Sequence, residues 1–291
     1  MHSLIANLLQ NGPVLTDGAW GTELQARGLS VGDFPDAWNV THPERVEEVA
    51  RAYVQAGSRV ILTNTFGANR TRLGEQELTS LITEINRSGV SISRRAAKDR
   101  ASVFASIGPS GKMLLSGEVS AEELRAAFEE QARALAEAGA DALVVETMSD
   151  LEEARLAVTA ARTTGLPIVA CMVFDSGREK DRTMMGTTPE QAAAALSDAG
   201  ADVIGANCGQ GIAGFVKICQ RLHNATDRPI WIKPNAGLPE MIDGRAVYRT
   251  APESFASYAP ALIQAGASFL GGCCGTSPDF IRALNRTFSG S

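Results

Sequence analysis

Three cysteines carry the strongest chemical signal in this sequence of 291 residues. Cys208 ends the apolar run Val203-Ile-Gly-Ala-Asn207, and the neighbours Cys273 and Cys274 end the run Phe269-Leu-Gly-Gly272. Gly209 follows Cys208 and Gly275 follows the cysteine pair, which places these thiols where a buried strand opens into a turn. Three cysteine sulfurs that converge from strand ends are a typical ligand set for zinc, and a free fourth position would make the site catalytic rather than structural.

The remaining thiols and the imidazoles show no comparable pattern. Cys171 lies within an apolar run and Cys219 within an expected helix, so both are interpreted as small buried side chains. His2 lies at the N-terminus, His42 in a Thr-His-Pro turn and His223 near a helix end. We therefore expect no histidine among the metal ligands.

Two carboxylates also lie at expected strand ends. Asp17 belongs to a Thr-Asp-Gly turn and Glu146 follows the run Ala142-Leu-Val-Val. One interpretation is purely structural, with Asp17 as a turn residue and Glu146 as a capping residue. A carboxylate at the end of an apolar strand is poorly solvated and needs a partner, which the amino group of a substrate would supply. The turn Asp17-Gly-Ala-Trp-Gly-Thr22 offers successive backbone N–H groups to an anion. Together these features would hold a zwitterionic amino acid at both ends.

Lys233 supports a different hypothesis. It follows the run Ile230-Trp-Ile and could form a Schiff base with a carbonyl substrate, as in aldolase-type barrels. Gly271 and Gly272 would then belong to a phosphate-binding loop. This interpretation leaves the two adjacent cysteines unexplained.

A repeated local pattern shows how these side chains are positioned. Four helical stretches end on Ala-Gly-Ala or Ala-Gly-Ser and lead directly into an apolar run, with the glycine as a left-handed helix cap. With four further apolar runs, the sequence predicts eight strands: 14–18, 60–66, 103–109, 142–147, 167–174, 203–209, 229–237 and 269–275. The expected helices alternate with them: 43–56, 75–98, 121–138, 151–163, 189–199, 212–222, 252–265 and 278–286.

Eight alternations of a buried strand and a helix in a chain of this length predict a single (β/α)8 barrel. The alternative, a doubly wound open sheet, does not account for the even count and the recurring spacing. In such barrels the chemistry lies at the C-terminal ends of the strands, where the residues discussed above fall. No linker or low-complexity stretch divides the chain, so one domain spanning residues 1–291 is expected.

Composition excludes several functional classes. The net charge is −6 and the pI is near 5.3, so no basic surface for nucleic acid is expected. The N-terminal sequence lacks the basic and apolar regions of a signal peptide, and no run approaches the roughly 20 apolar residues of a membrane span. Five cysteines are too few and odd in number for a disulfide scaffold. We therefore expect a soluble cytoplasmic protein with reduced thiols; an oligomer is possible.

Seven segments, in this order, resemble the homocysteine S-methyltransferase family, and most closely the homocysteine-binding module of cobalamin-dependent methionine synthase. They are DGAWGTELQARG, TNTFGANR, IGPSG, VVETMSD, GANCGQG, KPNAGLPE and GGCCGTSPDFI. The resemblance runs from about Val14 to Leu284, and its most specific elements are the Asn-Cys and Gly-Gly-Cys-Cys-Gly pair. It implies a homocysteine-binding (β/α)8 barrel with zinc on Cys208, Cys273 and Cys274.

The resemblance also implies which residues bind homocysteine: Asp17, Gly18, Ala19 and Glu146, with Thr63 as a less specific addition. Asn207, which precedes the first cysteine, is added to the expected substrate contacts. Until homocysteine arrives, zinc is expected to hold a neutral oxygen ligand, either water or a side chain, and Asn235 at the end of the seventh strand is the candidate. The chain departs from the betaine-using branch, which commonly has a tyrosine where this sequence has Gly67 and carries a C-terminal extension.

The expected function is therefore a zinc-dependent S-methyltransferase that converts homocysteine to methionine. Zinc would remove the proton of the homocysteine thiol and leave the nucleophilic thiolate. The methyl donor is left open among a methylcorrinoid protein, S-methylmethionine, S-adenosylmethionine, a betaine and another sulfonium compound, and another thiol could replace homocysteine. Besides the Schiff-base barrel on Lys233, the alternative is a non-catalytic zinc-thiolate binding protein.

Overall fold

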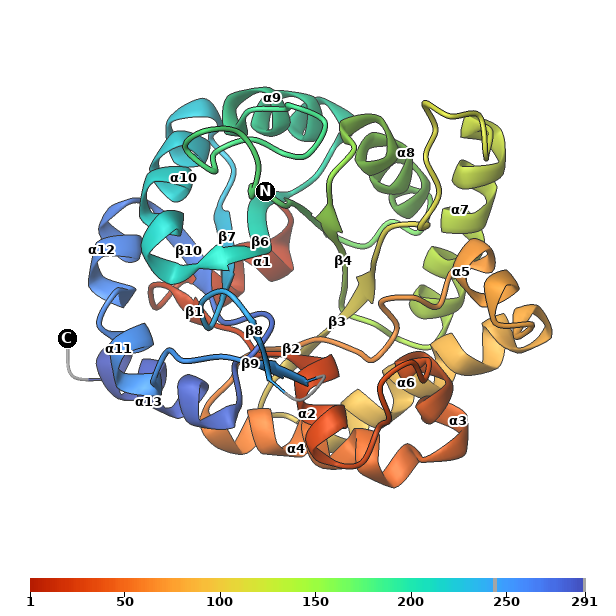
Figure 1. Ribbon diagram of the computed structural model, residues 1–291, viewed down its shortest axis with the longest axis horizontal. Coiled ribbons are helices and arrows are strands. Elements are labelled where there is room, and N and C mark those ends of the chain that lie inside the picture. The colour runs from red at the N-terminus through yellow and green to blue at the C-terminus, as the bar shows by residue number, and fades with distance from the viewer. Residues whose placement is uncertain (243–244, 290–291) are drawn as a thin grey trace.

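Eight parallel strands form the centre of the molecule in the computed structural model, which describes residues 1–242 and 245–289. They pair in the order β1-β10-β7-β6-β5-β4-β3-β2, and helices surround them (Figure 1). Their bounds are β1 Val14–Leu15, β2 Val60–Ile61, β3 Ser102–Ile107, β4 Ala142–Met148, β5 Ile168–Met172, β6 Val203–Gly211, β7 Ile230–Asn235 and β10 Ala267–Leu270. The predicted (β/α)8 barrel is confirmed.

The barrel closes between its first two strands through a side chain. The backbone N–H of Arg59 donates to the carbonyl of Leu15 at 2.8 Å, but the N–H of Leu62 donates to a carboxylate oxygen of Asp17 at 2.7 Å. Because Asp17 takes the place of a backbone acceptor, the regular ladder stops early. This explains why β1 and β2 are shorter than the predicted strands 14–18 and 60–66.

The main helices have the predicted local signals at their ends. They are α4 Pro43–Ala56, α6 Ile82–Ala97, α7 Ala121–Glu137, α8 Leu151–Arg162, α9 Pro189–Ala199, α10 Ile212–Ala225 and α13 Pro278–Ser289. Capping boxes begin α7 at Ser120 and α9 at Thr188. The glycines of the four Ala-Gly repeats all have positive φ angles, as the pattern predicts: Gly57, Gly139, Gly200 and Gly266.

Two predicted helices are each divided in the structure. The predicted helix 75–98 contains only the last residue of α5 (Arg70–Glu75), then a 3-10 turn η2 (Thr79–Leu81), and then α6; Glu77, with φ 57°, ends the first segment. The predicted helix 252–265 consists of α11 (Pro252–Ala256) and α12 (Ala259–Gln264). Pro260 lacks an N–H group, so it fits the first turn of a new helix but not the interior of a continuous one.

Several elements have no counterpart in the prediction. These are α1 (Ser3–Leu9), α2 (Trp20–Ala26), the short helices η1 (Pro35–Ala37) and α3 (Trp38–Thr41), and the hairpin of β8 (Glu240–Ile242) and β9 (Arg245–Val247). They are short or lie in loops, where apolar periodicity gives little signal. Of the predicted domain 1–291, residues 243–244 and 290–291 lie outside the described chain.

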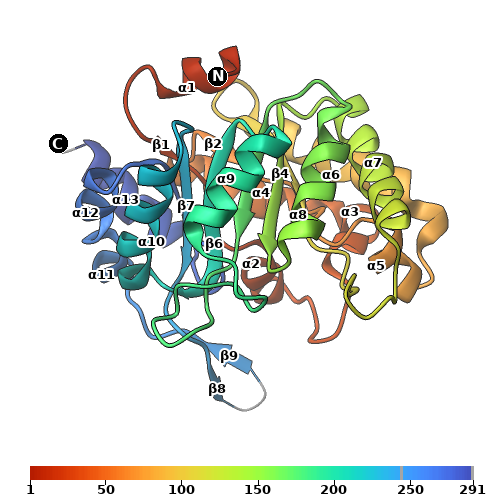
Figure 2. The same ribbon diagram turned by 90° about the horizontal axis from the view of Figure 1, so that it is seen from above.

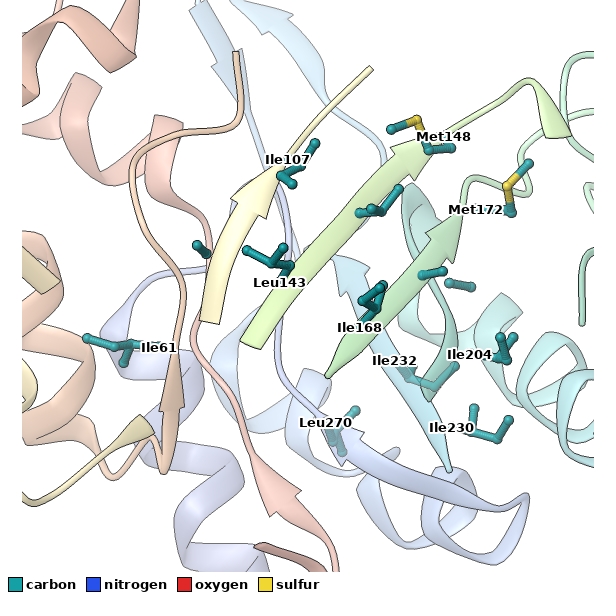
Figure 3. Packing of buried hydrophobic residues seen from close by; sticks show 14 of the residues in the cluster. Ile61, Ile107, Leu143, Met148, Ile168, Met172, Ile204, Ile230, Ile232 and Leu270 are labelled. Atoms are coloured by element: carbon teal, nitrogen blue, oxygen red, sulfur yellow. The ribbon is translucent and has the colours of Figure 1, made fainter. Parts of the chain in front are cut away.

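The apolar core has an inner and an outer layer. Trp231 fills the inside of the barrel, with its ring centroid 6.0 Å from that of Phe104 and 5.2 Å from that of Phe269. The outward side chains of the strands pack against the helices, as Ile61, Leu143 and Ile168 illustrate (Figure 3). The strands are thus buried on both faces, as their continuous apolar runs predict.

The two ends of the barrel are closed differently. Helix α1 lies at the N-terminal end of the strands, where Ile5 and Leu8 join the inner apolar layer, and the β8–β9 hairpin projects from the opposite end (Figure 2). Because α1 covers the N-terminal end, the C-terminal ends of the strands are the open end, where the functional side chains gather.

Within the described residues, no helix combines the length and the apolar character needed to cross a membrane.

Candidate metal and substrate site

The three thiol groups singled out in the sequence meet at the C-terminal end of the barrel. The sulfurs of Cys208, Cys273 and Cys274 all lie within 4.8 Å of one another, and the Cys208 and Cys274 sulfurs are 3.9 Å apart. All three residues are half-buried. No other group of three possible metal ligands of this kind occurs among the described residues.

Local backbone geometry aims these thiols inward. Cys208 has a φ of 62°, a left-handed conformation that costs free energy in a residue other than glycine. The β10 turn is tied to the end of β7, because Cys273 N–H donates to the Pro234 carbonyl at 2.7 Å and Ala236 N–H donates to the Cys274 carbonyl at 2.9 Å. Thr276 closes the turn with a hydroxyl bond to the Cys273 carbonyl at 2.7 Å.

The three thiols shift one another's pKa values when no metal is present. Hydrogen bonds from the thiols of Cys273 and Cys274 lower the pKa of Cys208, and the same interactions raise the pKa of Cys273 and Cys274. One thiolate held by two neighbouring thiols is thus the favoured state. Ionising all three sulfurs at this separation requires a cation between them.

The surroundings fit such a cation. The side chain of Asn235 is 4% exposed, and its Oδ1 atom has no hydrogen-bond partner among the described residues, while its amide group donates to the Cys208 sulfur. A buried amide oxygen without a partner is costly, and it lies beside the thiols. Three sulfurs and one neutral oxygen are a donor set that suits zinc.

A cavity of about 450 Å³ lies directly beside the thiols. The three cysteines, Gly18, Ala19, Thr63 and Glu146 contribute to its wall, so most of the predicted substrate residues are brought together. The first turn of α2 also lines it, with the aromatic side chains of Trp20, Phe34 and Phe66. The cavity therefore has a thiol-rich side, a polar side and an apolar side.

Glu146 is the carboxylate that faces this cavity. It is 7% exposed; Ser106 Oγ donates to its Oε1 at 2.5 Å, and the Asn207 amide donates to its Oε2 at 3.4 Å. Burial raises the pKa of Glu146, although Lys233 and the Ser106 hydroxyl offset part of this effect. A buried carboxylate beside a cavity is suited to bind a cationic group.

Asp17 lies just behind the cavity wall. It is 0% exposed and does not contribute to the described cavity wall; its carboxylate accepts from Lys233 Nζ at 2.5 Å, from Trp20 Nε1 at 2.7 Å and from Leu62 N–H. Its hydrogen-bonding capacity is largely used by the protein. These bonds make Asp17 an anchor for Trp20 and Lys233 in the substrate-free chain, and its contact with the substrate amino group stays a prediction.

Lys233 is 2% exposed and reaches the cavity wall. Burial alone would lower its pKa, but the carboxylates of Asp17 and Glu146 more than compensate, so the pKa of Lys233 is raised. The amine is thus held in its protonated form. A Schiff-base lysine must be neutral to attack a carbonyl, so this environment opposes the aldolase interpretation.

Asn207 lies behind the cavity and joins two strand ends. It is fully buried; its Oδ1 accepts from Thr147 N–H at 2.8 Å, and its amide group donates to Thr147 Oγ1 at 2.6 Å and to the Cys273 sulfur at 3.8 Å. It therefore positions β4 and β6 relative to the thiols rather than lining the cavity.

The other cysteines and the histidines have structural surroundings. Cys171 belongs to the inner apolar layer, and the thiol of Cys219 in α10 donates to the carbonyls of Leu262 and Ala265. His42 stacks on Trp38 with ring centroids 4.6 Å apart, His223 lies against Gly266, and His2 caps α1.

Three neighbours of the site were missed by the sequence reasoning. Ser106 precedes the end of β3, and no motif in the sequence marks it. Asp36, in η1, lines the outer cavity, and burial raises the pKa of Asp36 to about 7. Tyr248 follows the hairpin, and its hydroxyl group interacts with Cys274. Asp36 and Tyr248 both lie in loop segments, so only the folded chain brings them to the strand ends.

Comparison with known proteins gives a consistent result. A family model described as homocysteine S-methyltransferase matches residues 14–288. Methionine synthase from Mycobacterium tuberculosis (strain ATCC 25618 / H37Rv) is 32% identical over 299 positions, which cover 96% of this chain and 25% of that protein. Methionine synthase from Mycobacterium leprae (strain TN) is 33% identical over 92% of this chain and 24% of that protein. The chain thus spans about a quarter of the length of these relatives.

A solved structure matches over nearly the full length of both chains. The metallated form of the homocysteine methyltransferase MmuM from Escherichia coli superposes with a TM-score of 0.83 and 26% sequence identity, covering 98% of this chain and 100% of that one. The apo form of the same protein gives a TM-score of 0.76.

Proposed function

Because the chain belongs to the homocysteine S-methyltransferase family, we propose that it transfers a methyl group to the sulfur of homocysteine and so produces methionine. The observation that carries this proposal is the convergence of three thiols on one side of a substrate-sized cavity. A metal store would need no cavity with a buried carboxylate opposite its ligands, so the arrangement favours an enzyme over a non-catalytic binding protein.

Cys208, Cys273 and Cys274 would hold zinc, and Asn235 Oδ1 would be the fourth ligand before the substrate arrives. When bound, zinc supplies the Lewis acidity that keeps the substrate sulfur as a nucleophilic thiolate at neutral pH. A neutral amide oxygen is a weaker ligand than a thiolate, so the substrate displaces it readily. This role also accounts for the buried Oδ1 atom that lacks a partner.

The polar wall binds the amino-acid end of homocysteine. Glu146 accepts hydrogen bonds from the substrate ammonium group, and Ser106 and Asn207 hold that carboxylate in place. The substrate carboxylate lies toward the backbone N–H groups of the first turn of α2, which begins at Trp20. Gly18 and Ala19 line the approach to this turn, and Thr63 supports Ser106 by accepting its N–H at 3.1 Å.

Asp17 acts from behind this pocket and Lys233 from its wall. Asp17 fixes the indole of Trp20 through a 2.7 Å hydrogen bond and so sets the position of α2. The Lys233 ammonium group offsets the negative charge of the two carboxylates and the thiolates, and it adds a positive field for the substrate carboxylate.

The methyl donor enters through the part of the cavity that is lined by Trp20, Phe34 and Phe66, with Asp36 beside them. A small sulfonium or ammonium compound and a methylcorrinoid carried by another protein are the donor classes that the proposal retains. Either would present its methyl group to the substrate sulfur, which forms the new bond while the leaving group departs with the bonding electrons.

The deciding experiment measures methionine formation by the zinc-loaded protein with homocysteine and a panel of these donors. Zinc content is measured on the same samples, with Cys273→Ala as the test variant and Cys219→Ala as a matched control. We expect one zinc per chain and methionine production in wild type and Cys219→Ala, and loss of both in Cys273→Ala. Full zinc occupancy in Cys273→Ala would contradict the proposal.

The role of Asn235 has its own measurement. X-ray absorption at the zinc edge should show three sulfurs and one lighter atom in the substrate-free protein, and four sulfurs after homocysteine is added. Four sulfurs before addition would identify a closed structural site, as the non-catalytic alternative requires.

A further inference from the structure

Each sulfur of the thiol cluster has its own hydrogen-bond donor from the protein. The amide group of Asn207 donates to Cys273 at 3.8 Å, the backbone N–H of Gly209 donates to Cys208, and the hydroxyl group of Tyr248 donates to Cys274. Asn207 and Gly209 belong to β6, Asn235 at the end of β7 gives Cys208 a second donor, and Tyr248 lies in the segment after β9. Each sulfur thus has at least one donor from the protein.

In a four-thiolate centre, the protein's sulfurs and the substrate's sulfur are chemically alike, yet only the substrate should be methylated. We propose that these hydrogen bonds make the three cysteine sulfurs poorer nucleophiles than the substrate sulfur, and that Tyr248 protects Cys274 in this way. The inference rests on the proposed zinc methyltransferase function. It adds a reason for the choice of sulfur, which ligand identity alone does not give.

The physical basis is the effect of a donor on an anion. A hydrogen bond to a thiolate stabilises its lone pairs, and bonds to ionised acceptors are stronger than those between neutral groups. Thiolate nucleophilicity falls as the lone pairs are stabilised, as it does when a thiol becomes more acidic. In the proposed binding mode the one strong donor of homocysteine, its ammonium group, is held by Glu146 and is not directed at its own sulfur.

The reaction to be prevented is alkylation of the enzyme. A lone pair of the Cys274 sulfur would attack the donor carbon, a sulfur–carbon bond would form, and the bond from carbon to its leaving group would break with the electron pair on that group. No proton moves, because the sulfur is already deprotonated. The product is a neutral thioether, which binds zinc poorly, so the enzyme would inactivate itself.

Tyr248 is held in place by packing against the cysteine turn. A Cβ atom on Gly275 would lie 2.2 Å from Cγ of Tyr248, so the ring rests directly on this glycine. Gly275 N–H donates to Thr22 Oγ1 at 3.1 Å, which fixes the turn against α2. From this position the hydroxyl group reaches the sulfur of the preceding residue. The side chain is half-buried and packs on the main core, whereas residues 240–242 of the hairpin are exposed.

Tyr248→Phe removes the donor and keeps the ring, so it is the sharpest test. Zinc-loaded protein without substrate is treated with iodoacetamide, and alkylation of each cysteine is followed by peptide mass spectrometry. We expect Cys274 to react roughly tenfold faster than in wild type, as for the loss of one hydrogen bond to a charged group, with unchanged rates at Cys208 and Cys273. Tyr258→Phe, at the start of α12, is the matched control and should match wild type.

The outcomes separate this inference from the function itself. Wild-type protein that binds no zinc or makes no methionine would contradict the proposed function. Protein that binds zinc and makes methionine, but whose Cys274 reacts equally fast in wild type and Tyr248→Phe, would overturn only the protective role.

If Tyr248→Phe loses its zinc, a second variant is needed to separate the hydrogen bond of Tyr248 from its packing. Tyr248→His keeps a ring and a donor, so it should restore both zinc and the slow alkylation of Cys274. If the histidine variant also fails to bind zinc, the role of Tyr248 is packing and the inference is wrong. Cobalt substitution gives an activity-free readout, since the sulfur-to-cobalt charge-transfer band should move to lower energy when the donor is removed.

Discussion

At the scale of single residues, the two carboxylates of the site differ in what surrounds them. Asp17 accepts hydrogen bonds from three protein groups, including Lys233, and lies behind the cavity wall. Among the described residues, the direct donors to Glu146 are one hydroxyl and one amide, and Glu146 faces the cavity. Glu146 thus has the less complete set of protein partners, which is why the proposed function gives it the substrate ammonium group.

Glu146→Gln should raise the KM for homocysteine by about 10- to 100-fold, the range for a lost charge-assisted hydrogen bond. Zinc content should not change, because no ligand is altered. Steady-state kinetics with parallel metal analysis provides the check. Glu153→Gln removes another buried carboxylate, one that binds Ser110 and does not line the cavity, and should keep the wild-type KM.

The same residue predicts a pH dependence. Because burial raises the pKa of Glu146 above its ordinary 4.5, the carboxylate loses its charge at a higher pH than an exposed glutamate would. Homocysteine affinity should therefore be complete above this raised pKa and fall as the pH is lowered through it. In Glu146→Gln this fall in affinity at low pH should be absent. An identical fall in both proteins would assign it to another titrating group.

At the scale of elements, the ends of β4 and β6 are joined through Asn207. Near its C-terminal end, each strand has a left-handed residue that is not glycine: Thr147 with φ 63° in β4 and Cys208 with φ 62° in β6. Asn207 bonds the backbone and the side chain of Thr147 and also reaches Cys273. The unusual backbone that aims Cys208 is thus supported by one buried amide, which is typical of functional sites.

Asn207→Ala should leave Thr147 N–H buried without a partner and lower the free energy of unfolding by about 1–3 kcal/mol. Zinc affinity should fall about 10- to 100-fold, as for other residues that orient metal ligands. Urea denaturation and competition with a zinc chelator measure the two effects. The exposed Asn224→Ala is the control; wild-type zinc affinity in Asn207→Ala would show that the cysteines orient themselves.

At the scale of the whole molecule, the side chains that pack around α1 and the side chains of the proposed site lie at opposite ends of the barrel. Helix α1 covers the N-terminal end through Ile5 and Leu8, which join the inner layer around Trp231. The thiols, Glu146 and the cavity lie at the C-terminal end. A substitution at the N-terminal end should therefore change the free energy of unfolding with little effect on substrate and zinc binding.

Ile5→Ala should lower the free energy of unfolding by about 2–5 kcal/mol, the usual range for this truncation in a packed core. The KM for homocysteine and the zinc content should stay at wild-type values, because the thiol site is at the other end of the strands. Thermal denaturation and kinetics below the transition would test this. Asn7→Ala, exposed on the same helix, should change neither property; a changed KM in Ile5→Ala would show coupling through the barrel.

The barrel and its thiol ligands could be predicted from local sequence. Continuous apolar runs identify strands buried on both faces, and Ala-Gly pairs identify helix ends, because both depend on residues close in the chain. In a parallel barrel all strands end at one rim, so cysteines that follow two of these runs must lie near each other. The convergence of Cys208, Cys273 and Cys274 follows from that topology.

The partners of the charged groups were decided only by the tertiary structure. Asp17 and Lys233 are far apart in sequence, and their pairing depends on the register of non-adjacent segments, so the sequence could not show that Lys233 is the partner of Asp17. Tyr248 and Asp36 reach the site from irregular loops, whose paths carry no periodic signal. Local patterns indicate which segments form strands and helices, whereas the long-range packing of the whole chain decides where β1 and β2 end and which side chains are left free to act.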